Sequence, residues 1–266
     1  MQGFTSRLYS SILSAHYWAN VSIISKATIK QEFGSSFLSN IWLIIRPFIL
    51  ISVLAIILSR ITRFDGADNY PFYLTVNLVL WIYISNVMSA STSSILGRAS
   101  IFKFTPISKT IFILVDIIKF TKIYLISLFL VVVVVGYYTG ATIQTSYLLF
   151  PVYFMLLLIS LFSISIIFAY ITPYFRDLKF LVEALMPAFM WLTPIMYPIS
   201  AIDGILGTIL SYSPFTIVMS PFTSILYYGE IPTIDDHIKL FIILIFLITT
   251  AIFVYKKLAR NVVYYL

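Results

Sequence analysis

Long apolar runs separated by short polar stretches set the pattern of this sequence. Each run holds close to the roughly 20 residues with which an α-helix crosses about 30 Å of hydrocarbon. The pattern therefore predicts an all-α integral membrane protein with six transmembrane helices. The predicted spans are about 41–60, 71–90, 114–138, 147–170, 180–198 and 238–256.

The residues ahead of the first run are mixed in character. Leu13, Tyr17, Val21 and Ile24 recur at helical spacing, and lysines follow them. This pattern indicates an amphipathic helix in the membrane interface; a short lead-in with accidental periodicity is the alternative. We divide the chain into a cytoplasmic N-terminal segment, a six-helix membrane domain and a cytoplasmic tail, at residues 1–40, 41–256 and 257–266.

The start of the third run is charged. Asp116, Lys119 and Lys122 lie three residues apart and so share one helical face. We expect this end of the helix to protrude into the cytoplasm or to extend its lysines to the interface.

The fifth run carries three prolines, Pro187, Pro194 and Pro198. A membrane helix tolerates prolines where neighbouring protein satisfies the freed backbone groups. We expect this run to pack against other helices or beside a pathway rather than to face lipid.

The segment at 199–237 is long and still apolar. Its apolar pieces, 205–210 and 215–228, are too short to cross a bilayer and are punctuated by glycine and proline. They predict re-entrant half-helices between the fifth and sixth spans. A plain extracellular cap is the alternative.

Composition and charge agree with a lipid environment. Hydrophobic residues make up 61% of the chain and charged residues only 10%, unlike a soluble domain. The net charge of +7 does not indicate a nucleic-acid partner, because the cations occupy the short loops, where they act as topology signals. Most of the 17 lysines and arginines fall on the side of the N-terminus, which predicts that both termini are cytoplasmic.

Several chemistries have no residues to carry them. The sequence has no Gly-Lys dipeptide, hence no phosphate-binding P-loop. It has no cysteine, and its two histidines, His16 and His237, lie outside the predicted spans. A metal centre or a cofactor site in this chain is therefore not expected. An enzyme would have to rest on Asp116 or Glu183, so we do not predict catalytic residues.

The energy source must lie outside this chain if the protein is a transporter. A proton-driven carrier needs acidic or histidine groups near the midplane, and Arg46 is the only ionisable residue clearly within a span. This scarcity points to a separate ATPase subunit.

The stretch from Tyr174 to Pro198 carries a family resemblance. It reads Tyr-Phe-Arg-Asp-Leu-Lys and ends Leu-Thr-Pro-Ile-Met-Tyr-Pro. In this order and spacing it resembles the signature of ABC-2 type permeases that export O-antigen, capsule or teichoic acid polysaccharides. Ser36 to Pro47 resembles the start of the first span of that family, and Pro214 resembles its proline-led outer helix.

The resemblance implies the transmembrane subunit of an ABC exporter for a lipid-linked polysaccharide, with O-antigen as the first candidate. It implies a second copy of the chain and two ATPase subunits, with ATP and Mg²⁺ held by those partners and the complex placed in the bacterial cytoplasmic (inner) membrane. Two alternatives stay open: an ABC-2 permease for a drug or lipid, and a non-transporting membrane subunit of a glycan-synthesis complex.

The loop at 91–111 is the candidate docking site for the ATPase. Its cations punctuate apolar residues, as in a short amphipathic helix that would lie in a groove of the partner. A loop that only sets topology has the same composition. The docking residues would be Arg98, Ile101, Phe102, Lys103, Phe104 and Lys109.

Two further groups complete the candidate site. A cytoplasmic turn, in which Arg176 and Asp177 are expected to pair and cap the flanking helices, comprises Tyr174, Phe175, Arg176, Asp177 and Lys179. The substrate pathway would include Arg46, which either contacts a substrate phosphate or extends to lipid headgroups, and aromatic side chains that suit sugar rings or else form membrane belts and core. The pathway residues are Trp42, Arg46, Phe189, Met190, Thr193, Tyr197, Tyr212, Phe215, Phe222, Tyr227 and Tyr228.

Overall fold

The computed structural model of this chain describes residues 15–33, 45, 49, 53, 57, 69–104, 107–140 and 144–266. Every regular element in these residues is helical, as predicted. The predicted first span, 41–60, lies outside the described residues apart from four single positions. The helices are α2 (Ala15–Phe33), α4 (Tyr70–Ser93), α5 (Ala99–Phe104), α6 (Thr110–Leu130), α7 (Gly136–Thr139), α8 (Phe150–Ile171), α9 (Leu178–Leu192), α10 (Gly204–Ser211), α11 (Pro214–Thr223) and α12 (Ile234–Leu258).

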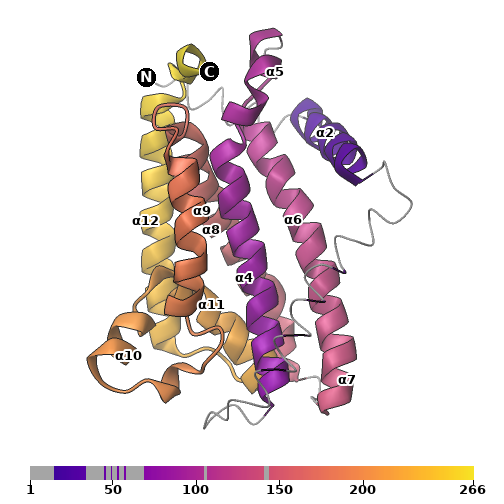
Figure 1. Cartoon of the computed structure of the whole chain (residues 1–266), viewed down its shortest axis with the longest axis vertical. Helices are drawn as coiled ribbons and strands as arrows, with labels where there is room; N and C mark the ends of the chain where they lie inside the picture. The colour runs from indigo at the N-terminus through magenta and orange to yellow at the C-terminus, as the bar shows by residue number, and fades with distance from the viewer. Residues whose placement is uncertain are drawn as a thin grey trace.

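Short 3-10 or π-helical turns continue or join these helices. They lie at Leu96–Arg98, Val131–Val135, Thr145–Leu149, Ile199–Ala201, Ser224–Tyr228 and Val262–Tyr265. Most of the long helices run along one axis, with α5 and the C-terminus at one end of the bundle and α10 and α11 at the other (Figure 1). We call these the α5 end and the α10 end.

Four helices are long and apolar enough to cross a membrane. They are Tyr70–Ser93, Thr110–Val135, Thr145–Ile171 and Ile234–Leu258. They coincide with the second, third, fourth and sixth predicted runs. Adding the bent pair described below gives up to five spans among the described residues.

The prediction of a continuous span from 180 to 198 is wrong. Helix α9 ends at Leu192 after 15 residues, and Thr193 is extended with φ −109° and ψ 140°. The cause is Pro194, because the ring of a proline disfavours a helical conformation in the residue before it. Pro187, in contrast, is accommodated inside the helix.

The apolar pieces after α9 form two short helical segments with a sharp bend between them. Gly204–Ser211 and Pro214–Tyr228 meet at 82°. Ser213 is extended, and Pro214 opens α11, where a missing N–H costs nothing because the first turn leaves it unpaired. The geometry fits either a broken span or a re-entrant loop.

Helix α4 is the centre of the bundle. It packs against α6, α8, α9 and α11, and most of its residues are buried. Its polar residues are paired inside: the Asn77 amide donates to the Tyr73 carbonyl at 2.9 Å, and Asn77 Oδ1 accepts from the Thr223 hydroxyl at 2.6 Å. The core of the protein therefore surrounds α4.

The remaining helices are arranged around this centre. Helices α8 and α12 form the most extensive helix pair. Helix α2 lies across the start of α6 (Figure 1), where Tyr17 and Val21 are buried with Ile111 and Val115. The Tyr17 and Thr110 hydroxyls are 3.1 Å apart. Tyr17 and Val21 thus lie on one face of α2, and this face packs against α6; Leu13 is outside the described residues.

Candidate functional site

A buried ion pair organises the α5 end. Arg98 ends the turn that follows α4, and its guanidinium donates to both carboxylate oxygens of Asp116 on α6, at 2.8 and 2.6 Å. The Asp116 side chain is only 6% exposed. Arg98 also donates to the Ser94 carbonyl at 3.0 Å. A bidentate pair of this kind fixes orientation as well as distance, so the pair joins α4, α5 and α6 rigidly.

Aromatic rings pack around this pair. The Arg98 guanidinium lies 5.2 Å from the centre of the Phe112 ring, and Phe102 of α5 meets Phe112 edge to face at 5.3 Å. The Lys109 ammonium lies 5.6 Å from the Phe102 ring, and burial lowers the pKa of Lys109. The predicted docking residues Arg98, Phe102 and Lys109 therefore come together.

The contacts of these residues correct one expectation about the docking loop. Arg98 was expected as a surface charge for a partner, but it is committed to Asp116 inside the chain. Ile101 is 39% exposed and is available on α5. Lys103 and Phe104 belong to α5, but their side chains lie outside the described residues.

The turn between α8 and α9 is held by its tyrosine. The Tyr174 hydroxyl donates to the Leu258 carbonyl at the end of α12 at 3.1 Å, and its ring lies 4.2 Å from that of Tyr265. The turn is thereby fixed to the C-terminal end of α12. Lys179 makes a long 4.0 Å contact with Glu183 one turn further on.

The expected pairing of Arg176 with Asp177 is not made. Both residues are exposed, as is Phe175, and Asp177 precedes α9 without a side-chain capping bond. No ion pair joins Arg176 and Asp177 among the described residues. The turn obtains its order from Tyr174, and the two charges remain at the surface.

The predicted pathway residues divide into several groups. Phe189 of α9 and Phe215 of α11 meet at 5.1 Å, and Phe215 meets Trp81 of α4 at 5.2 Å. Thr193 is buried and donates to the Phe189 carbonyl at 2.8 Å. Met190 is partly buried beside them. These residues brace α9 against the centre of the bundle.

Tyrosines tie the chain after α9 to the start of α4. The Tyr73 hydroxyl contacts the carbonyls of Pro194 and Tyr197 at 2.9 Å each. The Tyr197 hydroxyl donates to the Trp191 carbonyl at 2.8 Å. Tyr227 meets Tyr73 edge to face at 5.1 Å. Trp42 and Arg46 lie outside the described residues.

The outer aromatics are not one exposed cluster. Phe222 is 2% exposed and packs edge to face on Phe150 at 5.8 Å, so its assignment to the pathway is wrong and it belongs to the core. Tyr212 is 61% exposed, with the Lys239 ammonium 4.5 Å from its ring, and Tyr228 is 43% exposed. Only these two are exposed among the six pathway aromatics that were predicted to lie on the outer side, which are Tyr197, Tyr212, Phe215, Phe222, Tyr227 and Tyr228.

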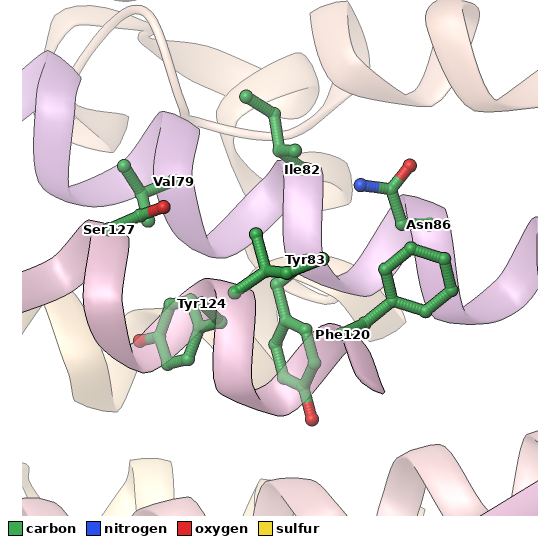
Figure 2. Close-up of a pocket in the computed structure, with 8 residues that line it drawn as sticks. Val79, Ile82, Tyr83, Asn86, Phe120, Tyr124 and Ser127 are labelled. Carbon is green, nitrogen blue, oxygen red and sulfur yellow. The ribbon is translucent and has the colours of Figure 1, made fainter. Parts of the chain in front are cut away.

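A small cavity lies between α4 and α6, within their contact. It measures about 20 Å³, and Figure 2 shows Tyr83 of α4 and Tyr124 of α6 among the side chains around it. The Tyr83 hydroxyl is 2.8 Å from that of Thr121. The buried hydroxyls of Tyr124 and Ser127, in contrast, have no partner in the part of the chain that the structure describes. The space is close to that of one water molecule.

Sequence reasoning missed Asp116 as the partner of Arg98. The signal was present, because a lone carboxylate in an apolar run needs a partner when it is buried. The spacing of 18 residues lies across a turn, however, and periodicity says nothing about such contacts. No group of three or more His, Asp or Glu that could hold a metal ion occurs among the described residues.

The fold defines the class of the molecule first: a multi-pass helical membrane protein with a polar, ion-paired end and a broken apolar helix at the other. The profile of the family described as "ABC-2 type transporter" matches residues 19–227. The match covers more than half of the chain, and the chain therefore belongs to the ABC-2 type transporter family.

Curated relatives align over most of the chain. The O-antigen export system permease protein RfbA of Myxococcus xanthus is 24% identical over 233 residues, which is 86% of this chain and 88% of the relative. A protein of the same name from Klebsiella pneumoniae is 25% identical over 193 residues, 72% and 74% of the two chains. The polysialic acid transport protein KpsM of Escherichia coli is 21% identical over 193 residues, with the same coverage.

Proposed function

We propose that this protein is the transmembrane subunit of an ABC exporter that moves a lipid-linked polysaccharide, with O-antigen as the leading candidate, across the bacterial cytoplasmic (inner) membrane. The observation that carries the proposal is that relatives named for O-antigen export and for polysialic acid transport both align over 72% or more of the chain. The absence of a P-loop from the sequence supports a separate ATPase as the source of energy.

The α5 end is the proposed docking surface for that ATPase. A short helix at the end of a bundle transmits force only if its base is rigid, and the Arg98–Asp116 pair supplies such a base. In this proposal two copies of the chain each dock one ATPase subunit, and the ATPases hold ATP and Mg²⁺. Ile101 and Phe104 would enter the partner, while Arg98 would hold α5 in place.

The membrane arrangement follows from the same assignment. We infer that residues 41–60 form the first of six spans, that α9 and its following turn form the fifth, and that both termini are cytoplasmic. The α10–α11 pair would be re-entrant, because each half is too short to cross a bilayer. Trp42, Arg46 and the α9 face would line the pathway between two copies.

Deletion of the gene tests the assignment. We expect loss of surface polysaccharide and accumulation of the lipid-linked glycan inside the cell, with both reversed by the restored gene. The purified chain alone should show no ATPase activity. Unchanged surface glycan would refute polysaccharide export, and altered drug or lipid efflux in the same strain would favour the other kind of ABC-2 permease. Accumulation of unfinished glycan instead would favour a subunit of a synthesis complex.

A further inference from the structure

An apolar groove lies among α4, α8, α11 and α12, on a different side of α4 from the cavity of Figure 2. Its volume is about 150 Å³. Leu161 of α8 is 3% exposed and is buried deep in the groove, whereas Phe246 of α12 is 66% exposed. The groove therefore runs from the outer surface of α12 toward the centre of the bundle.

The groove lies at the middle of the membrane-spanning helices. Its lining on α8 falls within residues 157–164 of a helix that runs from Phe150 to Ile171. Its lining on α12 falls within 243–247 of a helix that runs from Ile234 to Leu258. A surface opening at this depth faces hydrocarbon, not water or headgroups.

The lining selects an apolar occupant. The single hydroxyl in it belongs to Ser160, which donates to the Leu156 carbonyl at 2.9 Å and offers no free donor to a ligand. Water in such a space would lack hydrogen-bond partners, and a cavity of about 150 Å³ lined by aliphatic and aromatic side chains accepts a molecule the size of benzene. A helix of a second copy, about 10 Å across, is too thick for it.

We propose that this groove binds a hydrocarbon chain of a membrane phospholipid, with about six carbons of the chain inserted beside Phe215 and Val218 of α11. In hydrocarbon the gain comes from close packing rather than from leaving water. The bound chain would support the start of α11, directly after the bend of the pair, because Pro214 and Phe215 line the groove.

Trp81 provides a built-in probe of the occupant. Its ring lies 5.2 Å from that of Phe215 and is 3% exposed. A variant in which Trp18, Trp42 and Trp191 are changed to Phe would retain Trp81 as its only indole. The full chain would be reconstituted in vesicles of phosphatidylcholine that carries bromine at mid-chain, since bromine quenches indole fluorescence on close approach.

We expect Trp81 to lose most of its fluorescence in brominated vesicles relative to unbrominated ones. Val218→Phe, which fills the groove, should restore most of it. Ile242→Phe, at a 62% exposed α12 position outside the lining, is the matched control and should leave the quenching unchanged. Should Val218→Phe fail to fold, Ser160→Leu fills the same groove from α8.

Two outcomes would overturn the proposal. Absence of quenching in the parent protein would show that something other than lipid, such as a second copy, covers the groove. Equal quenching in the parent and the filled variants would show that lipid reaches Trp81 by another route. Neither outcome bears on polysaccharide export, which surface glycan measures independently.

Discussion

Two neighbouring tyrosines at the α4–α6 contact, Tyr83 and Tyr124, differ in whether their hydroxyls are hydrogen-bonded. Tyr83 and Tyr124 stack at 4.8 Å, but only the Tyr83 hydroxyl has a partner, Thr121 at 2.8 Å. A buried hydroxyl without a partner carries a desolvation cost and no compensating bond. The tyrosine hydroxyl is therefore expected to stabilise the fold at Tyr83 of α4 and to destabilise it at Tyr124 of α6.

Removing each hydroxyl in turn tests this difference. Tyr83→Phe should lower the free energy of unfolding by roughly 0.5–1.5 kcal/mol, because a hydrogen bond is lost. Tyr124→Phe should be neutral or stabilising, since its hydroxyl has no partner among the described residues. Unfolding of the purified variants in mixed micelles measures both. A clear loss of stability for Tyr124→Phe would indicate that a water molecule in the cavity bonds to it.

The ion pair at the α5 end should matter for folding. Asp116→Ala leaves the Arg98 guanidinium without its partner, and breaking a buried pair from one side costs roughly 3–5 kcal/mol. We expect reduced folded protein in membranes, with partial recovery in the exchanged pair Arg98→Asp, Asp116→Arg. Asp177→Ala is the control, because that carboxylate is exposed and makes no capping bond. Equal yields of Asp116→Ala and Asp177→Ala would contradict a structural role for the pair.

At the scale of the element, the short helix α5 matters most for function, because it is the proposed docking surface for the ATPase. Helix α5 has only six residues and cannot be stable alone. It is ordered by the Phe102–Phe112 contact and by the ion pair beneath it. Its exposed residues are therefore presented from a fixed base.

Docking is tested with α5 variants that leave the Arg98–Asp116 pair and the Phe102–Phe112 contact unchanged. Ile101→Asp and Phe104→Asp should each weaken co-purification of the ATPase subunit and lower export, because a carboxylate would have to be buried in the partner. Membrane insertion should be unchanged, since Ile101 is exposed in the single chain. Ser100→Asp, at an exposed neighbouring position, is a control for added charge. Survival of both complex and export in the two apolar variants would place docking elsewhere.

At the scale of the whole molecule, the proposed polymer path would use surfaces that one chain leaves exposed. Tyr212 and Tyr228 are exposed at the α10 end, while Phe222 is buried. Stacking of an aromatic side chain on a sugar ring is weak and does not depend on the exact position of the ring. A moving polymer requires such contacts, because one tight site would stall it. Aromatic contacts are worth roughly 0.5–1.5 kcal/mol beyond burial.

Export measured per folded protein separates path residues from core residues. Tyr212→Ala and Tyr228→Ala should each slow export by about tenfold at most, at about 1.4 kcal/mol per decade, and Tyr212→Phe should be near neutral because the ring is retained. Phe222→Ala should instead lose folded protein, since truncating a buried Phe costs roughly 3–5 kcal/mol. Normal export per folded protein in both tyrosine variants would refute a role for Tyr212 and Tyr228 in the substrate pathway.

The sequence by itself determined the helical class, the positions of four spans and the break after 210, because apolar run length and proline act locally. It also placed the family signature at Tyr174–Pro198. The length of α9 was not predicted: the helix ends at Leu192, six residues before the predicted end at 198, because Pro194 holds Thr193 in an extended conformation.

Only the tertiary structure decided which helix is central and which charges are paired. Helix α4 is the least apolar of the four candidate spans and the most buried. Hydropathy records affinity for lipid, whereas the centre of a bundle is surrounded by protein, and the Thr223 hydroxyl of α11 donates to Asn77 Oδ1 there. The tertiary structure also decided that Arg98 pairs with Asp116 and that Phe222 lies in the core rather than along the substrate pathway. These contacts join residues from different helices, and no local period of the chain encodes which helices meet.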